Sequence, residues 1–177
     1  DILEKIVSDC KGQPLKKINL FWFGDSLCNK RIIECLQIVR KGLPLVKLNL
    51  STNAGLLSEE KSRAMIDENL LDVINFDIDG IRKETFEKIR QRLDFDQVVR
   101  NVRFFLDYKK SKNTTKPETR ITVINMQPNQ EEIPAFIEYW KPLVDKVEVN
   151  QYNTWLGTQE DRNVGKSFEE SQSGEFT

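Results

Sequence analysis

Short apolar segments alternate with amphipathic stretches along most of this chain. Five segments have the composition and length of buried strands: residues 17–23, 45–50, 72–78, 119–125 and 145–151. Apolar positions at helical spacing follow them in five stretches: about 29–41, from Ser58 onward, 83–92, 96–110 and from Glu131 onward. Ser58 precedes two glutamates and is a predicted helix N-cap. Strands that alternate with helices predict a parallel sheet with right-handed crossovers.

The number of strands limits the architecture. A closed eight-stranded barrel usually takes about 250 residues, whereas this chain has 177 residues. We therefore predict an α/β fold, a partial parallel (β/α) TIM-like barrel with about five βα units, over residues 1–156. The segment 157–177 is rich in Glu, Ser, Gln and Gly and lacks an apolar period, which predicts a polar linker or a disordered tail.

Charge and composition narrow the class of partner. Lys and Arg number 27 against 28 Asp and Glu, without a block of like charge, which argues against a nucleic-acid surface. No apolar run approaches the roughly 20 residues of a membrane span, and the N-terminus is too charged for a signal peptide. Three cysteines make a disulfide framework improbable. We predict a cytoplasmic protein that binds neither nucleic acid nor membranes.

Polar residues follow each predicted strand, at the edge where parallel α/β sheets bind ligands. Turns and helix caps are polar in any case, so a single such residue carries little information. Five polar strand ends together favour a binding site. The residues are Gly24, Asp25 and Ser26; Ser51, Thr52 and Asn53; Asp77 and Asp79; Asn125 and Gln127; and Gln151 and Asn153.

Other motifs in the sequence are weaker evidence of function. FGDSL at 23–27 also opens GDSL hydrolases, with Ser26 as nucleophile, but the chain has no histidine to act as its base. No metal site is predicted at Asp77 and Asp79, and Asp79 and Gly80 are expected to form a turn. Cys28 and Cys35 are expected on one face of a single helix, as small buried side chains. Trp22 and Trp140 are expected in the core, and Trp155 is expected at a substrate mouth.

In order and spacing, these segments resemble the core of radical S-adenosylmethionine (radical SAM) enzymes, over roughly residues 1–157. Residues 23–26 resemble the GGEP segment, which holds the amino group of S-adenosylmethionine (AdoMet). Asp77 to Gly80 take the place of the SxDG pattern. The resemblance implies a cofactor site made of Gly24, Asp25, Ser26, Asn53, Asp77, Arg90, Asn125 and Gln151. Within it, Asn53 lies near the methionine, Arg90 binds the methionine carboxylate, and Asn125 and Gln151 lie near the adenosine or substrate.

The resemblance is to the SPASM-linked branch and implies an activity. A reduced [4Fe-4S] cluster cleaves AdoMet to a 5′-deoxyadenosyl radical, which abstracts hydrogen from a small-molecule or peptide substrate, and flavodoxin or ferredoxin supplies the electron. The cluster needs a CxxxCxxC loop, and Cys10, Cys28 and Cys35 do not have that spacing. Its ligands are therefore expected upstream of residue 1, and this chain alone is expected to be inactive. The alternative is a cluster-free, non-catalytic binding domain on the same fold.

Overall fold

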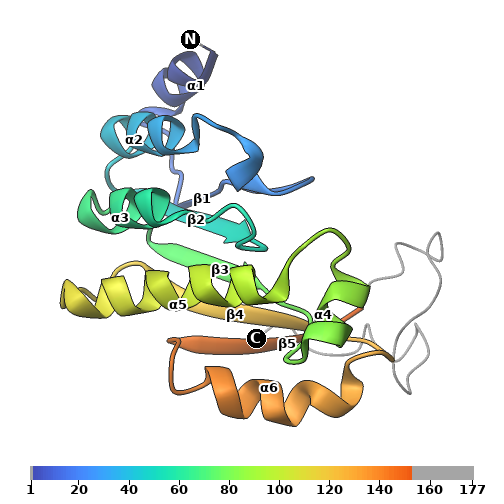
Figure 1. Ribbon diagram of the computed structural model, residues 1–177. Coiled ribbons are helices and arrows are strands. Elements are labelled where there is room, and N and C mark those ends of the chain that lie inside the picture. The colour runs from blue at the N-terminus through green and yellow to red at the C-terminus, as the bar shows by residue number, and fades with distance from the viewer. Residues whose placement is uncertain (1, 153–177) are drawn as a thin grey trace.

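The computed structural model describes residues 2–152, which form one five-stranded parallel sheet covered by helices (Figure 1). The strands lie in chain order: β1 (Lys17–Asn19), β2 (Lys47–Thr52), β3 (Val73–Asp77), β4 (Glu118–Asn125) and β5 (Lys146–Gln151). The helices are α1 (Ile2–Cys10), α2 (Ile32–Gly42), α3 (Glu59–Asp67), α4 (Lys83–Ile89), α5 (Phe95–Ser111) and α6 (Ile133–Trp140), with short 3-10 turns η1 (Ser26–Cys28) and η2 (Gln130–Glu132). The predicted partial parallel barrel is confirmed.

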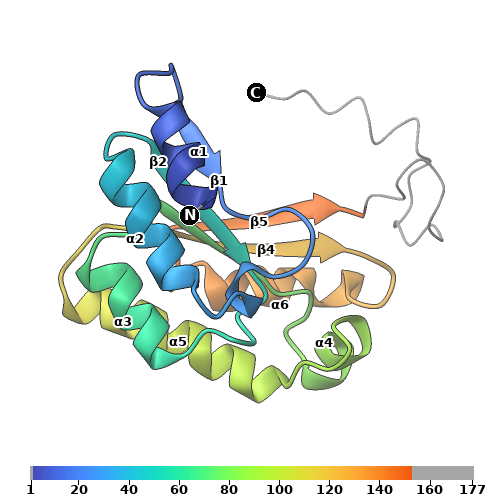
Figure 2. The same ribbon diagram turned by 90° about the horizontal axis from the view of Figure 1, so that it is seen from above.

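The two faces of the sheet differ in polarity. One face carries the buried core side chains Leu48, Leu50, Ile74, Phe76, Ile121 and Val123. Helices α2, α3 and α5 lie together on one side of the sheet (Figures 1 and 2). The other face is polar, because its residues in β2 and β3 include Asn49, Ser51, Asn75 and Asp77. There, Asn75 donates to Ser51 (3.1 Å) and Asp77 (2.7 Å) and accepts from Thr122 (2.8 Å).

The first strand is shorter than predicted. Residues 17–23 have strand composition, but β1 ends at Asn19, and only Leu20 makes one further backbone bond to Asn49. The chain then leaves the sheet, so Trp22 and Phe23 are 83% and 85% exposed. The prediction that Trp22 lies in the core is wrong, because within residues 2–152 β1 is an edge strand that pairs only with β2 and ends before Trp22. Trp140 is fully buried, as predicted.

Two features of the N-terminal third were not predicted. Helix α1 buries Val7 against α2, at a point where a Cβ on Gly42 would lie 2.1 Å from Val7 Cγ1. The close approach of the two helices therefore needs glycine at that position. The single helix expected for Cys28 and Cys35 is wrong, because Cys28 is exposed in η1 and Cys35 lies in α2. The Asn29 side chain accepts from the Arg31 amide between them and separates the two elements.

An ion-pair cluster fixes the amino ends of β2, β3 and β4. The Asp72 carboxylate accepts from Arg40 (2.7 Å), Lys116 (2.7 Å) and the Leu48 amide (2.9 Å), and its side chain is 14% exposed. Burial by itself would raise the pKa of Asp72, but these bonds outweigh burial and hold the pKa well below its usual range. A lowered carboxyl pKa stabilises the fold above the ordinary pKa, and this stabilisation is lost as the pH falls.

We expect Asp72→Asn to lower the free energy of unfolding at pH 7 by about 2 kcal/mol, because charge-assisted hydrogen bonds are lost. Urea unfolding at pH 7 and pH 3 measures the effect. The difference from wild type should shrink at pH 3, where wild-type Asp72 is losing its own advantage. Asp107→Asn, an exposed change on α5, is the control. An equal difference at both pH values would contradict the prediction.

Candidate functional site

A cavity of about 480 Å³ opens at the carboxyl ends of β1, β2 and β3. It is lined by Phe21, Trp22, Gly24, Asp25, Ser51, Thr52, Asn53, Asp77 and Arg90. Five of the eight predicted site residues thus lie around one cavity, although they come from three different strand ends and from the end of α4. Gly24 has φ +80°, and a Cβ there would meet no atom within 4 Å, so its backbone is open to a ligand.

A second cavity, of about 290 Å³, shares Asp77 and Arg90 with the first. Its other lining residues are Asp79, Thr122, Ile124, Asn150, Gln151 and Tyr152. Gln151 was predicted near the adenosine or substrate and lies in this second cavity. Ser26 and Asn125 line neither cavity. Ser26 Oγ donates to the Leu20 carbonyl, and Asn125 Oδ1 is buried with no hydrogen-bond partner in the described part of the chain.

The Asp25 carboxylate is bound to the chain itself. Its Oδ1 accepts from the Leu27 amide (2.8 Å), which caps η1. Its Oδ2 accepts from Thr52 Oγ1 (2.8 Å) and from the Asn53 amide (2.7 Å). Asp25 therefore joins the loop after β1 to the end of β2 and sets the shape of the cavity wall.

Asp77 is the last residue of β3 and faces both cavities. Its carboxylate accepts from Ser51 Oγ (2.6 Å) and from Asn75 Nδ2 (2.7 Å). Burial raises the pKa of Asp77, and the neighbouring Asp79 adds to the rise, against the opposing effects of Ser51, Arg90 and Asn75. The site therefore contains a carboxyl group whose protonation is easier than in water.

Asp79 was expected in a turn with Gly80, and that prediction is wrong. The residue is 2% exposed and bridges two segments: Oδ2 accepts from Arg90 Nε (2.7 Å), and Oδ1 accepts from the Ile124 amide (2.8 Å). No hydrogen bond or ion pair within residues 2–152 uses the two Nη atoms of Arg90. The guanidinium is thus bound to Asp79 through Nε, and Arg90 lines both cavities.

The segment after β3 is anchored by two further buried side chains. Asn129 donates to the carbonyls of Asp79 (2.9 Å) and Ile124 (2.8 Å) and accepts from the Met126 amide (2.8 Å). Glu132 accepts from the amides of Ile81 (3.1 Å) and Arg82 (3.2 Å) and from the Thr85 hydroxyl. Neither residue was predicted. Together they fix the position of Asp79, and through it that of Arg90.

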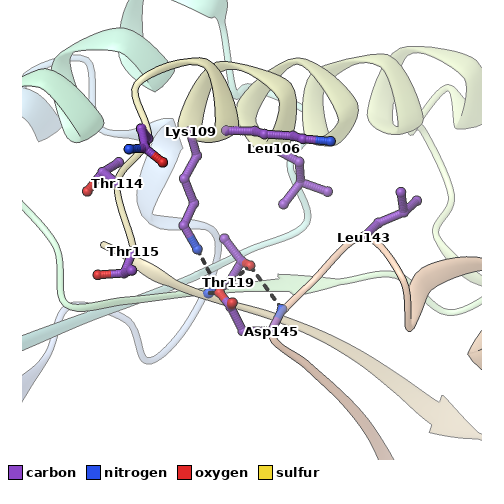
Figure 3. Close-up of a pocket in the computed structure, with 9 residues that line it drawn as sticks. Leu106, Lys109, Thr114, Thr115, Thr119, Leu143 and Asp145 are labelled. Atoms are coloured by element: carbon purple, nitrogen blue, oxygen red, sulfur yellow. Dashed lines mark hydrogen bonds and ion pairs between the residues drawn. The ribbon is translucent and has the colours of Figure 1, made fainter.

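A hollow of about 310 Å³ at the opposite edge of the sheet contains an ion pair (Figure 3). Lys109 of α5 points to Asp145 just before β5, at 2.7 Å, and Thr119 donates to the same oxygen through its amide and hydroxyl. Burial raises the pKa of Asp145, but Lys109 and Thr119 outweigh it and leave the pKa below its usual range. This arrangement fastens α5 to β4 and β5.

The described residues do not fit an iron–sulfur cluster. Within residues 2–152, no three His, Cys, Asp or Glu side chains lie close enough together to hold a metal ion. The three cysteines stand apart in α1, η1 and α2. AdoMet fits better, because the first cavity offers an open glycine backbone, carboxylates and a guanidinium with free nitrogens. None of the described helices is long and apolar enough to cross a membrane.

Neither a known protein family nor a curated protein matches this sequence. Solved structures do match, and their likeness shows the fold, a partial parallel (β/α) barrel. One is native anSMEcpe with bound AdoMet, an anaerobic sulfatase-maturating enzyme of the SPASM type, at TM-score 0.64 and 18% identity over 85% of this chain and 42% of that one. A second is native anSMEcpe with bound AdoMet and a Cp18Cys peptide, at TM-score 0.61 and 17% identity over 84% of this chain and 40% of that one. A third is native anSMEcpe with bound AdoMet and a Kp18Cys peptide, at TM-score 0.63 and 18% identity over 85% of this chain and 42% of that one.

The predicted resemblance is thereby confirmed at the level of the fold. The chain spans about two fifths of the length of these structures. The predicted boundary between residues 156 and 157, together with Asn153 and Trp155, lies outside the described residues.

Proposed function

We propose that this chain is the central part of the AdoMet-binding core of a radical SAM enzyme. The observation that carries the proposal is the cavity of about 480 Å³ that gathers Gly24, Asp25, Asn53, Asp77 and Arg90 at the carboxyl ends of neighbouring strands. Parallel α/β barrels bind their ligands at this edge. The same fold binds AdoMet in anSMEcpe, which supports the choice of ligand.

In this proposal the chain binds and orients the cofactor. Arg90 offers its free nitrogens to the methionine carboxylate, since a guanidinium matches a carboxylate with two parallel hydrogen bonds. The open backbone at Gly24 and the Asn53 side chain line the methionine end. When bound and reduced by one electron, AdoMet would supply the 5′-deoxyadenosyl radical that abstracts hydrogen from a substrate. The electron would come from a [4Fe-4S] cluster whose ligands lie outside the described residues.

We propose the second cavity as the place of the substrate. It adjoins the first at Asp77 and Arg90, so a molecule bound there would lie next to the cofactor. Its uncharged polar lining consists of Thr122, Asn150, Gln151 and Tyr152, which can pair with neutral amide or hydroxyl groups. A small molecule or a peptide has such groups, and anSMEcpe is known with bound peptides.

The full-length protein, reconstituted anaerobically with iron and sulfide and then reduced, should convert AdoMet to 5′-deoxyadenosine. Chromatography detects the product, and calorimetry without reductant measures AdoMet binding separately. AdoMet binding without 5′-deoxyadenosine and without uptake of iron would instead support the cluster-free binding domain. Absence of AdoMet binding would overturn the proposed site itself.

A further inference from the structure

The first cavity has an excess of negative charge. Asp25 and Asp77 line it, and the buried Asp79 lies directly behind Arg90. Three carboxylates and one guanidinium therefore lie in or next to this cavity. With all four groups ionised, the surroundings carry a net negative charge, which favours a ligand with a cationic group over a purely anionic ligand.

The Asp25 carboxylate is poorly placed to bind that cationic group. Its two oxygens already accept three hydrogen bonds, from Leu27, Thr52 and Asn53. These bonds cap η1 and fasten the loop to β2, so moving the carboxylate toward a ligand would undo the cavity wall. Asp25 therefore shapes the site more than it binds in it.

Asp77 has the opposite character. Its two hydrogen bonds come from side chains, Ser51 and Asn75, and use about half of the acceptor positions that a carboxylate offers. It lines both cavities together with Arg90. A carboxylate and a guanidinium that border one cavity complement the head of an α-amino acid, in which an ammonium and a carboxylate share one carbon.

We propose that Asp77 binds the ammonium group of the ligand while Arg90 binds its carboxylate. Asp77 then takes the part that the resemblance assigns to the segment containing Asp25. The proposal rests on the proposed function, since it takes AdoMet as the ligand. It makes Asp77 a specificity-determining residue of the site.

Binding of an ammonium group by Asp77 determines the direction in which affinity for AdoMet changes with pH. Asp77 binds an ammonium only when it is ionised, so affinity for AdoMet should rise as the pH increases through the pKa of Asp77, which burial places above the usual range. The titratable or charged groups around it are Asp25, Asp79, Arg90 and Tyr152. If Asp77 faced the ligand carboxylate, it would need its proton, and affinity would fall over the same range.

Calorimetry on the full-length protein with Asp77→Asn tests the proposal. AdoMet and S-adenosylhomocysteine both carry the ammonium, and both should bind about tenfold more weakly to the variant. 5′-Methylthioadenosine lacks the ammonium and should bind unchanged. The rise of AdoMet affinity with pH should disappear in the variant. Asp107→Asn, which removes an exposed negative charge on α5, should change none of these values.

A stability readout separates binding from a structural role. Because the native pKa of Asp77 is raised, its protonated form stabilises the fold, and that contribution is lost as the pH rises. Asp77→Asn should therefore unfold at no lower urea concentration than wild type at pH 7. Unchanged or tighter AdoMet binding by a stable variant would overturn the role of Asp77 while leaving the proposed function intact.

If wild-type protein fails to bind AdoMet, the proposed function fails, and two simpler probes still test Asp77. 5′-Amino-5′-deoxyadenosine is a cation at neutral pH, and adenosine is its neutral counterpart. A preference for the cation that Asp77→Asn abolishes would uphold the ammonium site. Equal affinity for the two nucleosides, or no binding of either, would overturn it.

Discussion

Replacing Asp79 by alanine should lower the free energy of unfolding by about 3 kcal/mol, the largest stability effect that we expect at the site. The carboxylate is 2% exposed and satisfies both Arg90 and the Ile124 amide. Its loss leaves that amide without a partner and Arg90 without its counter-charge. Because the Arg90 side chain is 30% exposed and can regain water, the cost stays near the lower end of the range for a broken buried pair.

Urea unfolding at pH 7 measures this loss. The matched control is Asp96→Ala, which removes an aspartate from an exposed ion pair with Lys83. Since exposed pairs contribute little, the control should lower the free energy of unfolding far less than Asp79→Ala does. A change of similar size in both variants would show that burial of Asp79 does not matter and would contradict the prediction.

The sheet could be predicted from the sequence because its signals are local. Each strand is a short apolar run, and each helix repeats its apolar positions at helical spacing, so five strands and the helices between them follow from neighbouring residues. The predicted cap at Ser58 is confirmed, since its side chain accepts from the Lys61 amide (3.2 Å). The prediction for Trp22 was wrong because composition does not show where a strand stops pairing with the strand beside it.

The gathering of Gly24, Asp25, Asn53 and Asp77 was also predictable, because parallel strands place their carboxyl ends at one edge, whereas the place of Arg90 at the end of α4 followed only from the resemblance. The contacts that each side chain makes there could not be predicted from the sequence. The partners of Asp79 lie 11 and 45 residues away, and Thr52 and Asn53, which bind Asp25, lie 27 and 28 residues away, so no local pattern signals either contact. An Asp-Gly pair is typical of a turn, and only the distant arginine partner shows that Asp79 has another role. The binding of AdoMet by these residues stays a prediction.

Replacing Arg90 should produce the largest effect on ligand binding. We expect Arg90→Ala to weaken AdoMet about 30-fold, since a charge-assisted pair with the methionine carboxylate is lost. Arg90→Lys should recover little, because one ammonium cannot both replace the Nε bond to Asp79 and form a fork toward the ligand. Calorimetry on the full-length protein measures both affinities.

An analogue of the ligand is the control for Arg90→Ala. Arg90→Ala also leaves Asp79 without its cation, so weaker binding by itself would not separate a lost contact from a distorted cavity. Decarboxylated AdoMet keeps the sulfonium and the ammonium and lacks only the carboxylate. If Arg90 acts through the carboxylate, its removal should leave the affinity for this analogue nearly unchanged, whereas Asp77→Asn should still weaken it. An equal loss for AdoMet and the analogue in Arg90→Ala would mean that Arg90 supports the cavity and does not bind the ligand.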